Sequence, residues 1–189
     1  MSLYVDGCSY AAGFGLDKSF SLGSLLNANY DASYSGKSNQ SIFHDVYSNL
    51  HKFDRFVISL TYPLRFQIFD AGVRIPVLPS ENGVAHRLKD TEYEKPYINF
   101  HKILYSLIDE NFYETLSDAI AESIITLFKH HNKKYLIYSW AGRENYLSSE
   151  IIFLSPFPSE EFRLPDGRHL NEKGMVNWAE DIRKRFYDQ

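Results

Sequence analysis

Short apolar runs alternate with amphipathic segments through the first sixty residues, and this alternation constrains the fold more than any other feature. Residues 3–5 and 56–60 have the length and composition of buried strands, and residues 30–34 form a weaker strand between them. The intervening segments carry apolar residues at helical spacing; Asp17 or Ser19 caps the first, and the second spans residues 39–51. Strands that alternate with helices in this order predict a parallel sheet with right-handed crossovers, and hence an α/β fold.

The second half of the chain resumes this pattern after an irregular stretch. Residues 62–96 lose periodicity and are punctuated by proline, with a hairpin predicted around Phe66 to Val77. Helical spacing then covers residues 97–131 with a break near Asn111, and strands at 134–140 and 151–154 precede a closing helix. A long irregular segment in a compact domain is usually functional or mobile, so residues 62–96 are interpreted as a lid, a dimer contact or a substrate wall.

Composition restricts the class of protein. With 189 residues and 44% apolar content, the chain can bury the core of one domain, residues 1–189. A formal net charge of −4 without a basic stripe argues against nucleic-acid binding by phosphate neutralisation. No apolar run approaches the ~20 residues of a membrane span, the N-terminus does not resemble a signal peptide, and the single Cys8 allows no internal disulfide. We therefore expect a cytoplasmic protein without nucleic-acid or membrane partners, and its oligomeric state is left open.

Two tetrapeptides near the ends of the chain supply reactive side chains. Gly7-Cys8-Ser9-Tyr10 follows the first predicted strand, and Asp166-Gly167-Arg168-His169 precedes the closing helix. Serine, histidine and aspartate are the side chains that serine hydrolases combine for nucleophilic catalysis. Taken separately, Ser9 is explained as a turn hydroxyl, Asp166-Gly167 as a turn dipeptide and His169 as a surface residue. Taken together, in this order, they favour a catalytic triad.

Strand order predicts that these motifs meet at one edge of the sheet. In an open α/β sheet, ligands bind beyond the carboxyl ends of the strands. Candidate site residues follow each of the first three strands and precede the last helix: Ser9, Gly36, Asn39, Thr61 to Arg65, Asp166 and His169. The sequence therefore predicts an active site at this edge.

The chemistry of each residue type suggests its role. Ser9 needs a base to become a nucleophile, and His169 is the candidate base and later the acid for the leaving alcohol. Asp166, three residues earlier, would orient the far side of the imidazole ring. The backbone N–H groups of Ser9 and Gly36 would bind the developing oxyanion, with the missing side chain of Gly36 allowing close approach. Asn39 would add a side-chain donor or cap the helix that follows.

These motifs resemble those of the SGNH (GDSL-like) hydrolase superfamily from one end of the chain to the other. Gly7-Cys8-Ser9-Tyr10 is similar to the Gly-Asp-Ser nucleophile motif, with Cys8 in place of the aspartate. Gly36 resembles the oxyanion glycine of the second motif, and Asp166-Gly167-Arg168-His169 resembles the terminal Asp-x-x-His. The resemblance implies a three-layer α/β/α fold with a flavodoxin-like parallel sheet, and catalysis by Ser9, Asp166 and His169.

The chain departs from the superfamily after the third strand. The superfamily has Gly-x-Asn-Asp there, and its asparagine completes the oxyanion hole, whereas this chain has Thr61-Tyr62-Pro63-Leu64-Arg65. Loss of one oxyanion donor costs on the order of 3 kcal/mol of transition-state stabilisation. Arg65, Asn39 or the hydroxyl of Thr61 would compensate, and Arg65 is favoured because a guanidinium binds an oxyanion or a carboxylate. A surface ion pair is the alternative explanation of Arg65.

The expected function is hydrolysis of an ester, such as an O-acyl group on a carbohydrate or another small polar substrate, through an acyl-enzyme on Ser9. No metal or cofactor is expected, because the histidines lack the spacing of a metal site and residues 13–15 do not form a dinucleotide motif. Tyr10, Tyr62 and Trp140 either line a sugar-binding cleft or pack in the core. Two other functions are compatible with the sequence: a catalytically weak module that binds a glycan or a protein, and an acyltransferase on the same scaffold.

Overall fold

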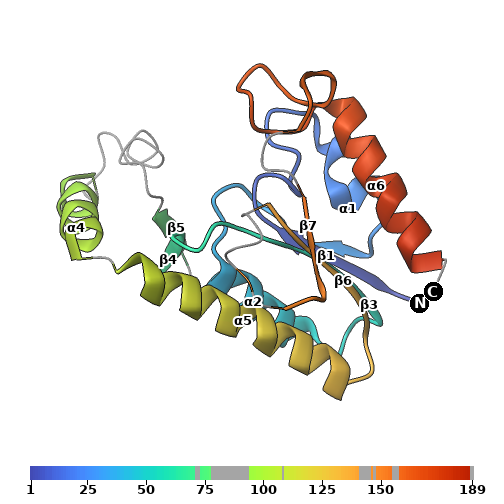
Figure 1. Ribbon diagram of the computed structural model, residues 1–189, viewed down its shortest axis with the longest axis horizontal. Helices are drawn as coiled ribbons and strands as arrows, with labels where there is room; N and C mark the ends of the chain where they lie inside the picture. The colour runs from blue at the N-terminus through green and yellow to red at the C-terminus, as the bar shows by residue number, and fades with distance from the viewer. Residues whose placement is uncertain are drawn as a thin grey trace.

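A five-stranded, entirely parallel sheet forms the centre of the protein in the computed structural model (Figure 1), which describes residues 1–70, 73–77, 94–107, 109–140, 146, 148–154 and 158–187. The strand order is β2-β1-β3-β6-β7. The strands are β1 (Leu3–Gly7), β2 (Tyr30–Asp31), β3 (Arg55–Leu60), β6 (Lys134–Ser139) and β7 (Ile151–Phe153). The predicted α/β class and parallel sheet are confirmed.

The order of the strands determines where a site can form. Counted along the chain, the parallel strands lie in the order 2-1-3-4-5, which is the flavodoxin-like arrangement. β1 pairs with β3 in a register that places Val5 beside Val57 and Gly7 beside Ser59. Because the order reverses between these two strands, the loops that follow them diverge and leave room for a ligand at their carboxyl ends.

Alternating side chains along the strands build two cores, one on each face of the sheet. Tyr4, Phe56 and Ile137 pack on one face with α2 (Asn39–Asn49) and α5 (Glu110–His130). Their neighbours Val5, Val57 and Leu136 pack on the other face with α1 (Leu22–Leu25) and α6 (Glu172–Tyr187). Figure 1 shows these helix pairs on opposite sides of the sheet, so the molecule has three layers.

Side-chain caps explain where several helices begin. Ser38 accepts a hydrogen bond from the Ser41 N–H at the start of α2, so Ser38 rather than Asn39 is the N-cap. Ser21 likewise caps α1, while Asp17 caps the short 3-10 helix Lys18–Phe20 before it. Asp109 caps α5, so the break predicted near Asn111 lies between α4 (Glu94–Leu107) and α5. The second predicted helix ends at Asn49, two residues earlier than expected.

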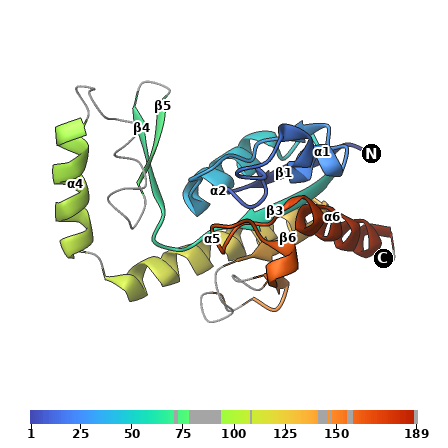
Figure 2. The same ribbon diagram turned by 90° about the horizontal axis from the view of Figure 1, so that it is seen from above.

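The described parts of the stretch from 62 to 96 contain regular structure. β4 (Phe66–Asp70) and β5 (Val73–Val77) form the predicted antiparallel hairpin, and α4 begins at Glu94. Pro96 is tolerated in the first turn of α4, where a backbone N–H has no helical partner. The hairpin and α4 lie to one side of the sheet in both ribbon views (Figures 1 and 2), whereas residues 78–93, including Pro79, lie outside the described residues.

The helices of the described segments are amphipathic. The longest of them, α5, has 21 residues and interrupts its apolar positions with charged ones. Across the described ranges, no helix combines the length and the apolar character that crossing a bilayer requires.

Candidate active site

Ser9 lies in a tight turn directly after β1. A Cβ atom on Gly7 would come within 2.7 Å of the Ser59 Cβ on β3, so only glycine lets the two strands end this close together. The chain then turns sharply, because the N–H of Ala12 donates to the Cys8 carbonyl and the N–H of Phe14 to the Ser9 carbonyl, both at 3.0 Å. This turn places Ser9 at the switch point of the sheet, with 4% of its surface exposed.

Asp166 and His169 are held by a closed loop before α6. The Leu164 N–H donates to the His169 carbonyl at 2.7 Å. The Asp166 side chain accepts hydrogen bonds from the N–H groups of Arg168, at 2.9 Å, and of His169, at 3.0 Å. Hydrogen bonds within the loop thus orient the Asp166 side chain without any contact with Ser9.

The three predicted triad residues meet, although Ser9 and His169 are 160 positions apart in the sequence. His169 Nε2 lies 3.0 Å from Ser9 Oγ, and His169 Nδ1 lies 2.6 Å from Asp166 Oδ2. Both separations are those of hydrogen bonds. Burial by itself would raise the pKa of Asp166, but hydrogen bonds from Arg168 and His169 outweigh it and lower that pKa below its ordinary value. The carboxylate is therefore charged at neutral pH, as an orienting group for an imidazole must be.

Aromatic rings from the Ser9 turn hold the imidazole. The ring centroids of Tyr10 and Phe14 lie 5.0 Å and 4.7 Å from that of His169, and both rings are tilted against it. Tyr10 in turn stacks on Trp140 at 4.3 Å, with the ring planes 9° apart. Tyr10 and Trp140 are each only 4% exposed, so most of each ring packs in the core. Tyr62, 37% exposed, is the member of that group that remains accessible.

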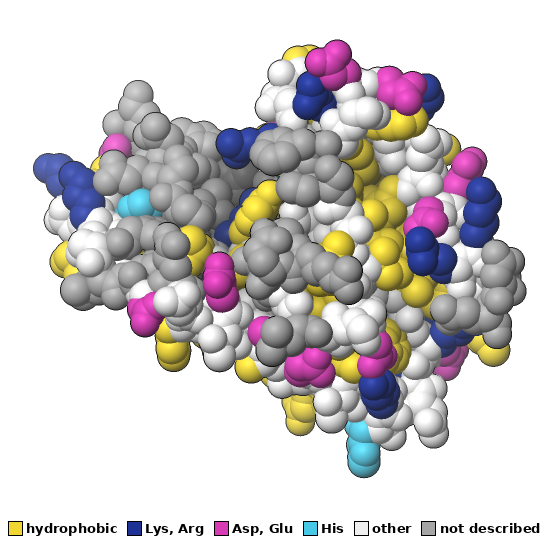
Figure 3. Space-filling model, viewed as in Figure 1, with side chains coloured by type: hydrophobic (Ala, Val, Ile, Leu, Met, Phe, Trp, Pro, Cys, Tyr) yellow, Lys and Arg dark blue, Asp and Glu magenta, His cyan; other side chains and the backbone are white. Residues whose placement is uncertain are grey.

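An apolar pocket of about 290 Å³ lies beside the same aromatic stack. Trp140, Trp178 and Leu170 contribute to its lining, and Figure 3 shows hydrophobic side chains exposed along the strip between β7 and α6. Trp140 belongs both to this lining and to the stack on Tyr10. The pocket wall therefore supports the ring that contacts His169.

Gly36 presents a backbone N–H in a turn that adjoins β1. The turn runs from Tyr34 to Lys37, is closed by the Lys37 N–H donating to the Tyr34 carbonyl at 3.4 Å, and has Gly36 in its third position at a φ of +84°. The Tyr34 N–H also donates to the Gly7 carbonyl at 3.2 Å, which places the start of the turn beside the end of β1. In the described part of the chain, neither the Ser9 N–H nor the Gly36 N–H donates to a protein acceptor. Both remain candidate oxyanion donors.

Asn39 has a different position from the expected one. Its side-chain amide donates to the Thr61 carbonyl at 3.0 Å and to the Tyr146 hydroxyl at 2.9 Å, and it lies 3.3 Å from Ser117 Oγ. Its carbonyl oxygen accepts from the Thr61 N–H at 2.9 Å. Both amide hydrogens therefore have acceptors inside the protein. In place of the expected contact with substrate, the structure shows the Asn39 side chain joining α2 to the end of β3.

We expect Asn39→Ala to lower the free energy of unfolding by about 3 kcal/mol, because the substitution leaves the buried Thr61 N–H without its acceptor and removes the donor to the Thr61 carbonyl and the Tyr146 hydroxyl. Urea denaturation monitored by circular dichroism would measure the change. Asn177→Ala is the matched control, since Asn177 is exposed on α6 and its loss should cost less than about 0.5 kcal/mol. Equal stability of the two variants would contradict the role assigned to Asn39.

The residues after β3 leave two polar groups available. The hydroxyl of Thr61 is buried, and within the described ranges it has no hydrogen-bond partner. The same holds for one terminal nitrogen of Arg65, whose guanidinium carbon lies 5.6 Å from the centre of the Tyr62 ring. Burial raises the pKa of Tyr10, and the positive charges of Arg65 and Arg168 act in the opposite direction, so both cations lie near this ring. Among the described residues, Arg65 makes no ion pair, and its guanidinium contacts the ring of Tyr62.

Some residues of the site carry no recognisable signal in the sequence. Phe14 lies in a glycine-flanked loop, and Tyr146 follows a segment without periodicity. Lys37 lies in a predicted turn, where a lysine is normally exposed, yet its side chain is fully buried. In the parts of the chain that the structure describes, no group of three or more His, Cys, Asp or Glu side chains could hold a metal ion.

Comparison with solved structures identifies the fold. TesA has a TM-score of 0.55 and 14% identity over 96% of each chain. The psychrotrophic esterase EstA from Pseudoalteromonas sp., in a structure inhibited by monoethylphosphonate, has a TM-score of 0.55 and 12% identity over 100% of this chain and 99% of its own. No protein-family model matches the sequence, and a search of curated proteins finds no significant match. Similarity at these identities shows a shared fold over the whole chain, and it agrees with the three-layer α/β architecture.

Proposed function

We propose that this protein is a serine hydrolase that cleaves esters through an acyl-enzyme on Ser9. The observation that carries the proposal is the chain of contacts from Ser9 Oγ to His169 Nε2, at 3.0 Å, and from His169 Nδ1 to Asp166, at 2.6 Å. The location of Ser9 at the switch point of the sheet, and the fold shared with the esterase EstA, are consistent with it.

In the first half of the reaction, Ser9 Oγ attacks the ester carbonyl carbon and its proton passes to His169 Nε2. Asp166 stabilises the resulting imidazolium through Nδ1. The Ser9 and Gly36 N–H groups bind the oxyanion of the tetrahedral intermediate. The intermediate collapses as the carbon–oxygen bond of the leaving alcohol breaks, and His169 donates its proton to that alcohol.

In the second half, water replaces the alcohol. His169 takes a proton from the water, whose oxygen attacks the acyl carbon, and a second tetrahedral intermediate forms in the same oxyanion site. Breakage of the bond to Ser9 Oγ, with return of the proton from His169, releases the acid and restores the enzyme. An acyltransferase would differ only in using a second alcohol in place of water, so analysis of the products separates the two activities.

Arg65 is proposed to take the place of the missing third oxyanion donor. A guanidinium supplies several N–H donors in a fixed plane, and one terminal nitrogen of Arg65 has no acceptor among the described residues. We propose a small polar ester as substrate, with O-acetylated carbohydrates as the first class to test. An ester panel of increasing acyl length, including acetylated sugars, would define that preference.

A phosphonate probe tests the proposal directly. A fluorophosphonate mimics the tetrahedral intermediate and reacts only with an activated serine, so we expect stoichiometric labelling of wild type at Ser9. Ser9→Ala should abolish labelling, and intact-mass spectrometry of both proteins provides the measurement. Absence of labelling in folded wild type would overturn the proposal in favour of a catalytically inert module that binds a glycan or protein.

A further inference from the structure

A fully buried lysine lies beneath the turn that contains Gly36. Both Lys37 and Asp6 have side chains with no exposed surface, and Lys37 Nζ lies 2.5 Å from Asp6 Oδ1. The other two acceptors of this ammonium group are Asp45 Oδ2 at 2.6 Å and the Ala32 carbonyl at 3.0 Å. An ammonium group has three hydrogens to donate, so these three acceptors satisfy it completely.

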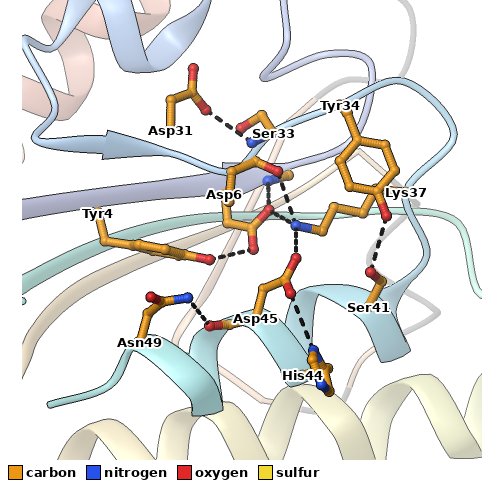
Figure 4. Close-up of polar contacts among 12 residues, drawn as sticks. Tyr4, Asp6, Asp31, Ser33, Tyr34, Lys37, Ser41, His44, Asp45 and Asn49 are labelled. Carbon is orange, nitrogen blue, oxygen red and sulfur yellow. Dashed lines mark hydrogen bonds and ion pairs between the residues drawn. The ribbon is translucent and has the colours of Figure 1, made fainter. Parts of the chain in front are cut away.

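The acceptors come from three separate parts of the layer between the sheet and α2. Figure 4 shows Lys37 extending between Asp6 on β1 and Asp45 on α2, with Tyr4 and Tyr34 beside them. Asp6 is further held by the Tyr4 hydroxyl, at 2.9 Å, and by the Gly7 N–H, at 2.7 Å. Lys37 thus links β1, α2 and the segment after β2 through one atom.

The contacts of Lys37 also fix the position of the turn that contains Gly36. Its turn is attached to β1 at both ends: the Tyr34 N–H donates to the Gly7 carbonyl, and the Lys37 side chain donates to Asp6. β1 is also the strand that leads directly into Ser9. The two backbone donors proposed for the oxyanion, those of Ser9 and Gly36, are therefore positioned from the same three-residue segment, Asp6 to Cys8.

We infer that Lys37 is a positioning residue for catalysis, because its buried contacts with Asp6 and Asp45 hold the Gly36 N–H in register with Ser9. The inference rests on the proposed ester hydrolysis, and it names the residue that positions one of the two backbone oxyanion donors. A buried ion pair contributes little net stability, since desolvation of both charges offsets their attraction. Burial raises the pKa of Asp6 to about 7, although Lys37 acts to lower it. The cost of desolvating the carboxylate is thus larger than its attraction to the lysine. We therefore expect loss of these contacts to change the rate of the reaction, through the position of the Gly36 N–H, more than the stability of the fold.

The test uses a neutral double variant, Asp6→Asn/Lys37→Met, which removes both buried charges and keeps an acceptor for the Gly7 N–H. We expect kcat to fall about 10²-fold with KM almost unchanged, because a misplaced donor weakens binding of the transition state more than of the substrate. The rate on a p-nitrophenyl ester should fall more than on its thiono counterpart, whose sulfur depends less on the oxyanion donors. A merely structural role would not change the ratio of these rates.

Lys133→Met is the matched control. Lys133 Nζ donates to the Phe53 carbonyl at 2.7 Å, so this lysine also links two distant segments. The link lies at the amino ends of β3 and β6, away from the active site at their carboxyl ends. Loss of the Lys133 ammonium group should leave kcat and the ratio of ester to thiono ester rates unchanged. Asp45→Ala provides a second variant that removes one acceptor of Lys37 at a partly exposed position, and we expect a several-fold loss of kcat.

A folded double variant with wild-type kcat and an unchanged ratio of ester to thiono ester rates would overturn the inference, as would wild-type kcat in folded Asp45→Ala. Failure of the proposed function has a different signature: wild type itself would hydrolyse no ester and would not react with the phosphonate probe.

Discussion

Ser9→Ala is expected to lower kcat for ester hydrolysis by about 10⁶-fold, the size of effect measured when a serine hydrolase loses its nucleophile. The reason is that no covalent intermediate can form, and His169 Nε2 loses the hydroxyl that lies 3.0 Å away. Purified protein from which trace wild type has been excluded is needed, with activity followed on p-nitrophenyl acetate. The fold should be unaffected, because the backbone turn around Ser9 is held by main-chain hydrogen bonds.

Ser59→Ala is the matched control for this variant. Ser59 is also a buried serine near the end of a central strand, and its hydroxyl finds no partner among the described residues. Its removal should leave kcat within about twofold and stability within about 0.5 kcal/mol. Activity of Ser9→Ala within tenfold of wild type would mean that another residue acts as nucleophile.

Asp166→Asn is expected to lower kcat by about 10⁴-fold while KM changes little. An asparagine can still accept the N–H bonds of Arg168 and His169, so the loop should keep its conformation. However, its amide would donate to His169 Nδ1, which forces the ring proton onto Nε2. A protonated Nε2 cannot accept the proton of Ser9, and the imidazolium that forms during the reaction would lose its charged partner.

Glu160→Gln serves as the control for removal of an acidic side chain from the same segment. Glu160 pairs with Arg163 at 3.1 Å and is almost fully exposed, so its loss should not affect kcat. Circular dichroism and thermal unfolding would verify that both variants are folded. If Asp166→Asn loses less than tenfold in kcat, Asp166 does not orient the general base.

The sequence contained enough information to predict the architecture and the pairing of Ser9 with His169. Hydrophobic periodicity is a local property, so alternating strands and helices could be read directly, and the strand order of an α/β sheet limits where their carboxyl ends meet. The break before α5 was likewise visible, and the structure attributes it to a cap at Asp109. β2 was overestimated, because residues 32–34 continue to hydrogen-bond with β1 but do so outside the regular ladder.

The positions of individual polar side chains were decided by the tertiary structure. The sequence does not distinguish Asn39 as a substrate ligand from Asn39 as a buried link, because its partner Tyr146 lies 107 residues away. Nor does it distinguish Lys37 from the exposed lysines, since its burial depends on Asp6 and Asp45 both facing the layer under the sheet.

Sequence alone therefore determined the parallel sheet with its helices and the edge at which the reactive groups gather, because both follow from patterns that repeat along the chain. Only the tertiary structure decided which groups at that edge are available to a substrate and which are occupied in holding the loops. That division has a physical cause: a buried polar group must find its hydrogen-bond partner wherever the fold brings one, and such partners come from distant segments.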